Sequence, residues 1–499
     1  MSNIRITYSG FISFFVSLIT VVVGTAYTLI LTRTLSQEEY GVWGLIAGLI
    51  GYVILVNQII TYWSTRETAR KIESGKTAVF GSMILSTIGF GIFIVSSIVM
   101  SYQTEIDSSV FFLASILIPI MFLHGILFAI NFGWKPHVGS YANFVLGISQ
   151  VPCAIIFVYH LELGVTGIIF SSFIAYSLSS LVLFRYAKNH IRNQIKLLFF
   201  KSWIKLSWIP LYPGLSLFVD NLGIIIYSSI TGSVLGLAIW TAANVIPGII
   251  RYVGQISLAV YPRLLEGGDK KYLEDNILNL FYFNFLMLGI AIAFAKPALF
   301  ALNPIYQEAY LVLVILAIRN FFFVLSNVFI QNLGGNETID ISENPTFTQY
   351  IKSKLFYPHT IKLIHVSIAT SILPIGLIIL IQNKFETIDL LTFWATILLI
   401  FQIPLTIYLY FLTKKNLDFS LNYLIIGKYG ISFAISFSLI HILSENFLVY
   451  HESVFEFIPQ VLVFVILAIS LYFGLTFVLD YKTRNLFKAV TKEIRGKLF

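Results

Sequence analysis

The fold of this chain is decided by stretches such as residues 211–232, which read LYPGLSLFVDNLGIIIYSSITG. The stretch is long enough to cross the hydrocarbon core of a bilayer, which takes about 20 mostly apolar residues in a helix. Its only charged residue, Asp220, lies near the middle. A carboxylate at the centre of a bilayer costs roughly 2.5–3.5 kcal/mol on insertion scales. We therefore expect Asp220 to be paired, hydrated or functional.

Similar apolar runs fill the chain of 499 residues, of which 57% are hydrophobic and 11% charged. Soluble domains carry about 25% charged residues, so the composition predicts an all-α integral membrane protein that crosses the bilayer many times. The single cysteine, Cys153, excludes an internal disulfide and a cysteine-based metal site. The sequence has no Walker A motif and no clustered histidine ligands. We expect no metal, no cofactor and no ATP hydrolysis.

The apolar runs predict about 14 transmembrane helices. The first run lacks a clear signal-peptide cleavage site, so we expect it to span the membrane rather than to be removed. The predicted spans cover about 8–32, 41–63, 79–101, 110–132, 142–160, 165–186, 207–230, 236–262, 276–297, 309–332, 361–382, 390–412, 429–449 and 457–480.

The placement of Lys and Arg predicts the orientation. An even number of spans puts both termini on one side, and a cytoplasmic N-terminus places most of the 32 Lys and Arg residues on the cytoplasmic face. Positively charged loops stay inside, so the net charge of +8 reflects topology and not nucleic-acid binding. The basic segments 186–206 and 481–499 look amphipathic, and we expect them to lie along the inner leaflet. The alternative is that each is a solvated basic helix.

The spacing of the spans predicts two halves. Span one begins near residue 8 and span seven near residue 207, which gives an N-terminal six-helix lobe (1–186) and a C-terminal six-helix lobe (207–412). A cytoplasmic linker (187–206) joins them, and the second lobe carries a polar insert (334–358). Spans thirteen and fourteen (413–480) and a basic tail (481–499) follow. Repeated halves with a site between them are a common transporter plan.

Four motifs resemble a known family. Residues 33–45, RTLSQEEYGVWGL, are similar to the element after the first span of polysaccharide-export flippases, which belong to the multidrug/oligosaccharidyl-lipid/polysaccharide exporter superfamily. Residues 65–76, TRETARKIESGK, resemble the basic segment after their second span. Residues 261–271, YPRLLEGGDKK, resemble their exit from span eight, and residues 303–317, NPIYQEAYLVLVILA, their entry to span ten. Beyond span ten only hydropathy supports the resemblance.

The resemblance implies a flippase, similar to Wzx-like O-antigen flippases, that moves a lipid-linked oligosaccharide from the cytoplasmic to the outer leaflet by alternating access. Two pseudo-symmetric six-helix bundles would surround a central cavity, with two further C-terminal helices. It also implies a prokaryotic host, a location in the cell membrane, and the glycan lipid, membrane lipids and glycan-assembly enzymes as partners.

A polyprenyl phosphate or pyrophosphate headgroup is anionic, so cations in or beside the spans are the candidates for binding it. Arg251 lies near mid-depth in predicted span eight and Arg319 in span ten. Arg33 ends span one, and Arg66 follows span two. Arginine suits phosphate because its planar guanidinium can donate two parallel hydrogen bonds.

Asp220 is the candidate partner of Arg251. Their predicted depths differ by about 5 residues, or about 7–8 Å along a helix, which side chains can bridge. The pair would satisfy Arg251 until phosphate displaces the carboxylate; the alternatives are a static ion pair and a titratable switch. Asn221 and Asn244 lie close to this pair in sequence, and we expect them in the cavity.

Two other functions fit the hydropathy. A multidrug or cation antiporter of the same superfamily would have about twelve spans and cavity carboxylates. A membrane-embedded glycosyltransferase or glycan polymerase would need a sizeable external loop with catalytic residues, which the short predicted loops do not supply. We therefore expect a transporter and not an enzyme.

Overall fold

The computed structural model describes residues 19–20, 23–69, 72–104, 106–135, 137–257, 270–337, 339 and 346–485. The described chain is built of helices and contains no strand. Within it, 13 helical stretches are long and apolar enough to cross a membrane. They match the second to the fourteenth predicted spans one for one. The predicted first span, 8–32, lies partly outside the described residues, and residues 23–32 of it are helical.

Contacts within the chain divide it into two units, Met1–Val245 with Asn344–Phe401, and Ile246–Glu343 with Gln402–Phe499. The first unit contains α2 (Gln37–Leu55), α3 (Gln58–Ala69), α4 (Gly75–Thr104), α5 (Ser108–Ala114), α6 (Leu117–Trp134), α7 (His137–Ala154), η1 (Ile155–His160), α8 (Gly164–Ala187), α9 (Leu197–Lys205), α10 (Trp208–Thr231), most of α11 (Leu235–Ile250), α16 (Phe347–Lys352), α17 (Tyr357–Gln382) and the first half of α18 (Thr387–Leu417).

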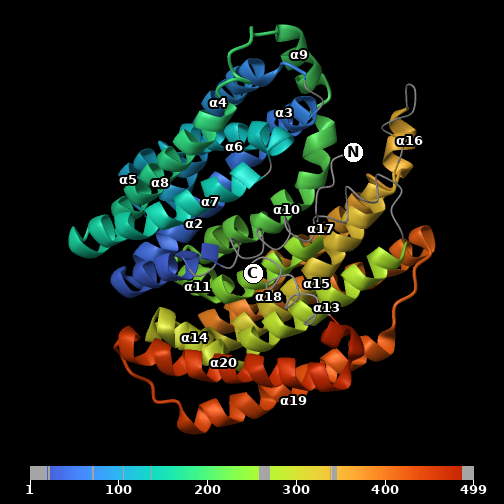
Figure 1. Ribbon diagram of the computed structural model, residues 1–499. Coiled ribbons are helices and arrows are strands. Elements are labelled where there is room, and N and C mark those ends of the chain that lie inside the picture. The colour runs from blue at the N-terminus through green and yellow to red at the C-terminus, as the bar shows by residue number, and fades with distance from the viewer. Residues whose placement is uncertain are drawn as a thin grey trace, which may run out of the picture. The chain divides into compact units, whose positions relative to one another are not determined.

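Polar bridges between helices fix the packing of the first unit, where α8 runs along α6 and α7 (Figure 1). The Asn131 Nδ2 group on α6 donates to the Leu183 carbonyl on α8 at 2.9 Å. The Asn57 Nδ2 group donates to the Phe122 carbonyl at 3.1 Å. Lipid chains are as apolar as the helices, so such hydrogen bonds and close packing hold membrane helices together.

In helix α2 the sequence determines both where the helix begins and how closely α11 can approach it. Its first turn is a capping box, in which the Glu39 N–H donates to Ser36 Oγ at 3.1 Å and the Ser36 N–H donates to Glu39 Oε2 at 2.9 Å. Further along, a Cβ atom on Gly44 would lie 2.6 Å from Thr241 Oγ1 of α11. Glycine at this position therefore permits the close approach of α2 and α11.

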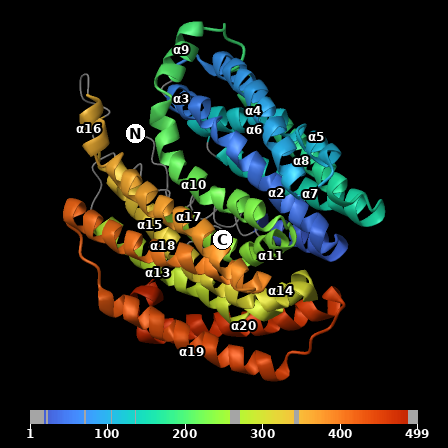
Figure 2. The ribbon, with the colours of Figure 1, turned by 180° about the vertical axis from the view of Figure 1, so that it is seen from behind.

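The second unit contains the end of α11, η2 (Arg251–Ser257), α13 (Lys270–Ala293), α14 (Ala295–Leu302), η3 (Pro304–Ala309), α15 (Tyr310–Gly335), the second half of α18, α19 (Tyr423–Phe447) and α20 (Val454–Leu479). Helices α13, α19 and α20 pack against one another (Figure 2). Tyr472 on α20 is fully buried there, and its hydroxyl donates to the Tyr282 carbonyl on α13 at 2.9 Å.

Predicted span 41–63 is wrong in its extent, because the helix breaks before its end. Predicted span 236–262 is confirmed as far as Ser257, and residues 258–262 lie outside the described residues. Predicted span 41–63 ends at Leu55, and α3 begins at Gln58 after a turn that contains Asn57. The Asn57 Oδ1 atom accepts a bond from Ser82 Oγ at 2.8 Å, which helps to fix the turn against α4. Predicted span 236–262 changes geometry after Ile250. Pro247 lies just before that change and removes one backbone donor from α11.

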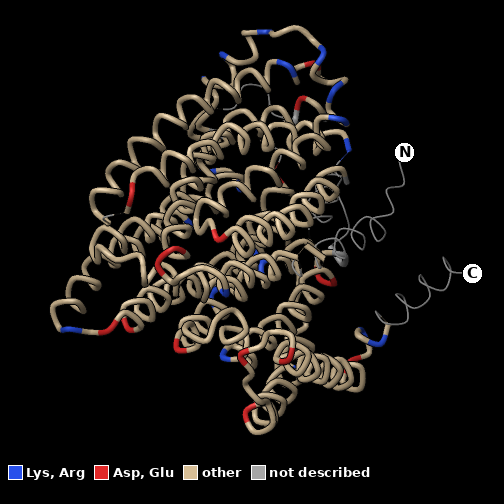
Figure 3. The backbone as a smooth tube through the Cα atoms, turned by 90° about the vertical axis from the view of Figure 1, so that its left-hand side faces the viewer, with Lys and Arg blue, Asp and Glu red and all other residues tan. Residues whose placement is uncertain are grey.

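Charged residues are sparse along the helices and gather near their ends. Figure 3 shows Lys and Arg concentrated at the end of the first unit where α9 lies. This distribution is typical of membrane proteins. The cytoplasmic position of the termini and the lobe boundaries at residues 187–206 stay predictions.

Candidate functional site

The candidate site begins where α11 gives way to a 3₁₀ segment. Arg251 is the first residue of η2, and its side chain is exposed. A stretch of 3₁₀ geometry inside a span often marks a hinge. Non-α backbone at membrane depth is tolerated only where protein or a water-filled space surrounds it. The break therefore sets Arg251 apart from residues that face lipid on a regular helix.

Helix α15 orients the Arg251 side chain. The Arg251 Nε group donates to Asn320 Oδ1 at 3.0 Å. The guanidinium carbon lies 5.0 Å from the centre of the Phe323 ring, within the range of a cation–π contact. These two contacts hold the Arg251 guanidinium in a defined orientation, and a planar guanidinium has a geometry that suits phosphate.

Arg319 precedes Asn320 on α15 and is 6% exposed. The two candidate arginines thus lie in the same unit, on elements that pack against each other. Polar contacts anchor α15 on its other sides. The Asn284 Nδ2 group of α13 donates to the Phe321 carbonyl at 3.0 Å, and Gln402 Nε2 of α18 donates to Ser326 Oγ at 3.1 Å.

Asp220 and Asn221 lie on α10 in the first unit, and both side chains are half-buried. A Cβ atom on Gly51 would lie 3.8 Å from Asn221 Nδ2, so Asn221 faces α2. Asp220 belongs to the first unit and Arg251 to the second. Their pairing stays a prediction.

The remaining candidates are spread over the first unit. Asn244 uses its Nδ2 group to donate to the Trp240 carbonyl of its own helix at 2.9 Å. Arg33 is half-buried in the helical residues 23–34. The backbone of Arg66 belongs to α3, and its side chain lies outside the described residues. The structure therefore brings Arg251 and Arg319 into one unit, and a shared cavity with the others stays a prediction.

An aromatic stack in the first unit has no signature in the sequence. The rings of Trp240 and Trp394 are parallel, with centroids 3.7 Å apart and 2° between their planes. Tyr227 stacks on Trp394 at 5.8 Å. A Cβ atom on Gly223 would lie 2.5 Å from the Trp394 ring. No spacing rule links residues on three separate helices, so only the tertiary structure reveals this stack.

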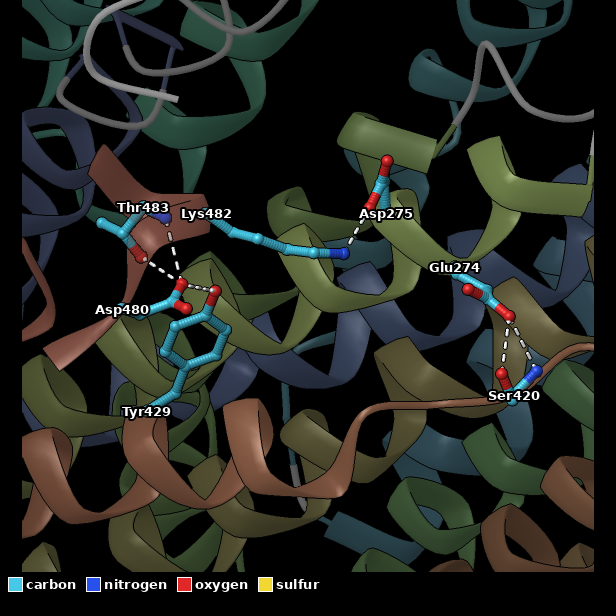
Figure 4. Close-up of polar contacts among 7 residues, drawn as sticks. All are labelled: Glu274, Asp275, Ser420, Tyr429, Asp480, Lys482 and Thr483. Carbon is cyan, nitrogen blue, oxygen red and sulfur yellow. Dashed lines mark hydrogen bonds and ion pairs between the residues drawn. The ribbon is translucent and has the colours of Figure 1, made fainter. Parts of the chain in front are cut away.

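A polar cluster in the second unit is likewise absent from the sequence predictions (Figure 4). The buried Asp480 carboxylate accepts bonds from the Tyr429 hydroxyl at 3.0 Å and from the N–H and hydroxyl of Thr483 at 3.0 and 3.1 Å. Lys482 forms an ion pair with Asp275 at 2.7 Å. The chain segment after α20 is thereby held against α13 and α19.

Three successive residues of α13 connect this cluster to the segment that carries Arg251. Glu274 Oε1 accepts a bond from the Ser420 N–H at 2.8 Å, and Asp275 binds Lys482. Next to them, Asn276 Oδ1 accepts a bond from Ser257 Oγ of η2 at 2.8 Å. The first turns of α13 therefore tie η2 to the loop after α18 and to the segment after α20.

The sequence matches no protein-family model and no curated protein sequence. Its structure is similar to solved transporters. The lipid II flippase MurJ in an inward closed conformation is 13% identical, with a TM-score of 0.63, and the match covers 96% of this chain and 100% of MurJ. An inward-facing multidrug resistance MATE family transporter of the MOP superfamily is 15% identical, with a TM-score of 0.55. That match covers 80% of this chain and 94% of the transporter.

A third similar structure is a MOP superfamily transporter from Pyrococcus furiosus, described as having a binding pocket of reverse polarity that suggests a different function. It is 14% identical, with a TM-score of 0.53 over 82% of this chain and 94% of that protein. At these identities the likeness establishes the fold and nothing finer. The chain has the all-helical fold shared by MATE transporters and the lipid II flippase MurJ.

Proposed function

We propose that the protein is a flippase that moves a lipid-linked oligosaccharide, carried on a polyprenyl phosphate or pyrophosphate, from the cytoplasmic to the outer leaflet. The observation that carries the proposal is Arg251 at the break in its span, oriented by Asn320 and Phe323. A phosphate headgroup must cross about 30 Å of hydrocarbon. A held arginine at a helix break offers it charge and hydrogen bonds along that route.

The extent of the structural match supports a flippase over a drug exporter. The match to MurJ covers 96% of this chain, and the match to the inward-facing MATE transporter leaves a fifth of it unmatched. The positive charge of the candidate site also favours a flippase over a drug exporter. Arg251 and Arg319 favour an anionic ligand, whereas a cation antiporter needs carboxylates at the corresponding place.

In this role the protein is a multi-pass transporter in the cell membrane. Glycan-assembly enzymes make its substrate before the flipping step and use it afterwards. The lipid carrier stays among the membrane lipids while the headgroup passes along the protein. Alternating access would be gated at breaks such as the one at Arg251, where few backbone hydrogen bonds need to change.

A reconstitution experiment tests the proposal. The purified protein is placed in liposomes with fluorescent polyprenyl-pyrophosphate glycans, and an external glycosidase reports how much substrate reaches the outer leaflet. We expect protein-dependent loss of protection for at least one glycan. No translocation across several glycans, together with drug-coupled sodium or proton flux, would identify an antiporter instead. Formation of a longer glycan would identify a polymerase.

A further inference from the structure

The short helix α9 has two faces with different surroundings. Its inward face packs on α3 and α4, where Trp203 is 1% exposed and its Nε1 group donates to Glu67 Oε1 at 2.9 Å. The Phe200 ring lies 2.7 Å from the place that a Cβ atom on Gly81 would take. These contacts fix the rotation of α9 about its axis, so its other face has one defined direction.

The outward face combines apolar and cationic side chains. Leu198 is 83% exposed and Leu197 56%, and Ile204 is 41% exposed. Lys201 and Lys205 are exposed on the same face, because residues three or four apart lie together on a helix. Two adjacent exposed leucines are unfavourable on a helix that faces only water. Two lysines are unfavourable on a helix that faces only lipid chains.

The charge around this face has a single sign. Residues 187–206 contain Lys188, Arg192, Lys196, Lys201 and Lys205 and no Asp or Glu. The candidate spans on either side are Gly164–Ala187 and Pro210–Thr231, so α9 connects the end of one to the start of the next. A segment between the ends of two spans is expected at the depth of lipid headgroups. Basic, amphipathic helices at this depth bind anionic lipid surfaces.

We propose that the outward face of α9 binds the headgroups of anionic phospholipids in the surrounding membrane, with Leu197, Leu198 and Ile204 inserted beside them. Each lysine near an anionic surface favours association about fivefold. Lys201 and Lys205 therefore enrich anionic lipids around α9 over zwitterionic ones. This inference rests on the packing and charge of α9 and is independent of the transported substrate.

A fluorescence experiment on the full-length protein tests it. Replacing Leu198→Cys in a Cys153→Ala background allows a single fluorophore to be attached to the exposed face. The protein is reconstituted with chain-brominated phosphatidylglycerol or chain-brominated phosphatidylcholine at equal mole fractions, and lipid quenching is compared. We expect phosphatidylglycerol to quench several times more strongly. Lys201→Gln with Lys205→Gln should bring the ratio close to one.

The matched control is Lys414→Gln with Lys415→Gln, which removes two exposed lysines from the last turn of α18 and should leave the ratio unchanged. Three results would overturn the inference. Equal quenching by the two lipids would show no charge selection, and a preference that survives the loss of Lys201 and Lys205 would assign it elsewhere. Protection from both lipids and from aqueous acrylamide would indicate that a protein covers α9.

Discussion

At Arg251 a single residue combines a helix break, a hydrogen bond to Asn320 and a ring contact with Phe323. A hydrogen bond to a charged group contributes about 1.5–3 kcal/mol. We therefore expect Arg251→Gln to slow the flipping of pyrophosphate-linked glycan by roughly tenfold or more. Arg251→Lys should have an intermediate effect, since it keeps the charge but loses the planar guanidinium that can donate two parallel hydrogen bonds.

The control for that prediction is Arg185→Gln, which removes an exposed arginine from the last turn of α8. Its flipping rate should stay close to that of the unmodified protein, with all variants compared at equal amounts of inserted protein. Equal rates for Arg251→Gln and Arg185→Gln would remove Arg251 from the mechanism.

Asn320 is a positioning residue in this account, because its carbonyl oxygen fixes the Arg251 side chain. We expect Asn320→Ala to raise the apparent KM for the glycan lipid more than it lowers the maximal rate. Asn284→Ala is the matched control, since Asn284 is also buried and anchors α15 through the Phe321 carbonyl. If both variants change KM equally, the effect comes from loosened packing of α15 and not from Arg251.

At the scale of elements, the contact of α2 with α11 depends on Gly44. A Cβ atom there would lie 2.6 Å from Thr241 Oγ1, too close for ordinary contact. Gly44→Ala should therefore lower the thermal unfolding temperature in detergent, and adding Thr241→Ala should recover part of the loss. Gly91→Ala on α4, whose Cβ position has no neighbouring atom within 4 Å among the described residues, should not destabilise. A neutral Gly44→Ala would contradict the packing.

An ion pair between Lys482 and Asp275 joins the segment after α20 to α13. Both side chains are partly exposed, at 32% and 49%, so we expect a coupling free energy below about 1 kcal/mol in a double-mutant cycle. The variants are Lys482→Met, Asp275→Asn and their combination, with unfolding as the readout. Charge exchange by Lys482→Asp with Asp275→Lys should restore stability relative to either single reversal. No recovery would exclude the ion pair as the source.

The stabilisation from the Lys482–Asp275 ion pair should depend on pH. Burial acts to lower the pKa of Lys482, but the hydrogen bond and charge of Asp275, with smaller contributions from Tyr481 and Glu274, outweigh it and raise that pKa. A raised pKa means that the folded state favours the protonated lysine. Its stabilising effect is complete below the pKa of the unfolded state and is lost as pH rises through the folded value. The loss of stability across the alkaline range should therefore be smaller in Lys482→Met than in the unmodified protein.

For the whole molecule, the sequence predicts the fold well because membrane spans are set by local hydropathy. For this reason each of the second to fourteenth predicted spans has its counterpart in the structure, although span 41–63 is wrong in its extent. The breaks after Leu55 and Ile250 were missed, since a window of about 20 residues averages over a turn that is only a few residues long. Pro247 lies three residues before the end of α11, where its missing N–H removes one backbone donor.

The candidate site was less predictable, because its contacts join segments far apart in the sequence. Arg251 and Arg319 could be named from charge within apolar runs alone. The bond from Arg251 to Asn320 joins residues 69 positions apart, and hydropathy carries no signal for it. The Trp240–Trp394 stack and the Asp480 cluster are missed for the same reason.

The central claim is that the protein moves an anionic lipid headgroup past Arg251. The most direct test compares two substrates that carry the same glycan on the same polyprenyl chain, one through a pyrophosphate and one through an uncharged linkage. The account predicts rapid flipping of the pyrophosphate lipid, slow flipping of the neutral one, and loss of this difference in Arg251→Gln. Equal flipping of both substrates by the unmodified protein would contradict it.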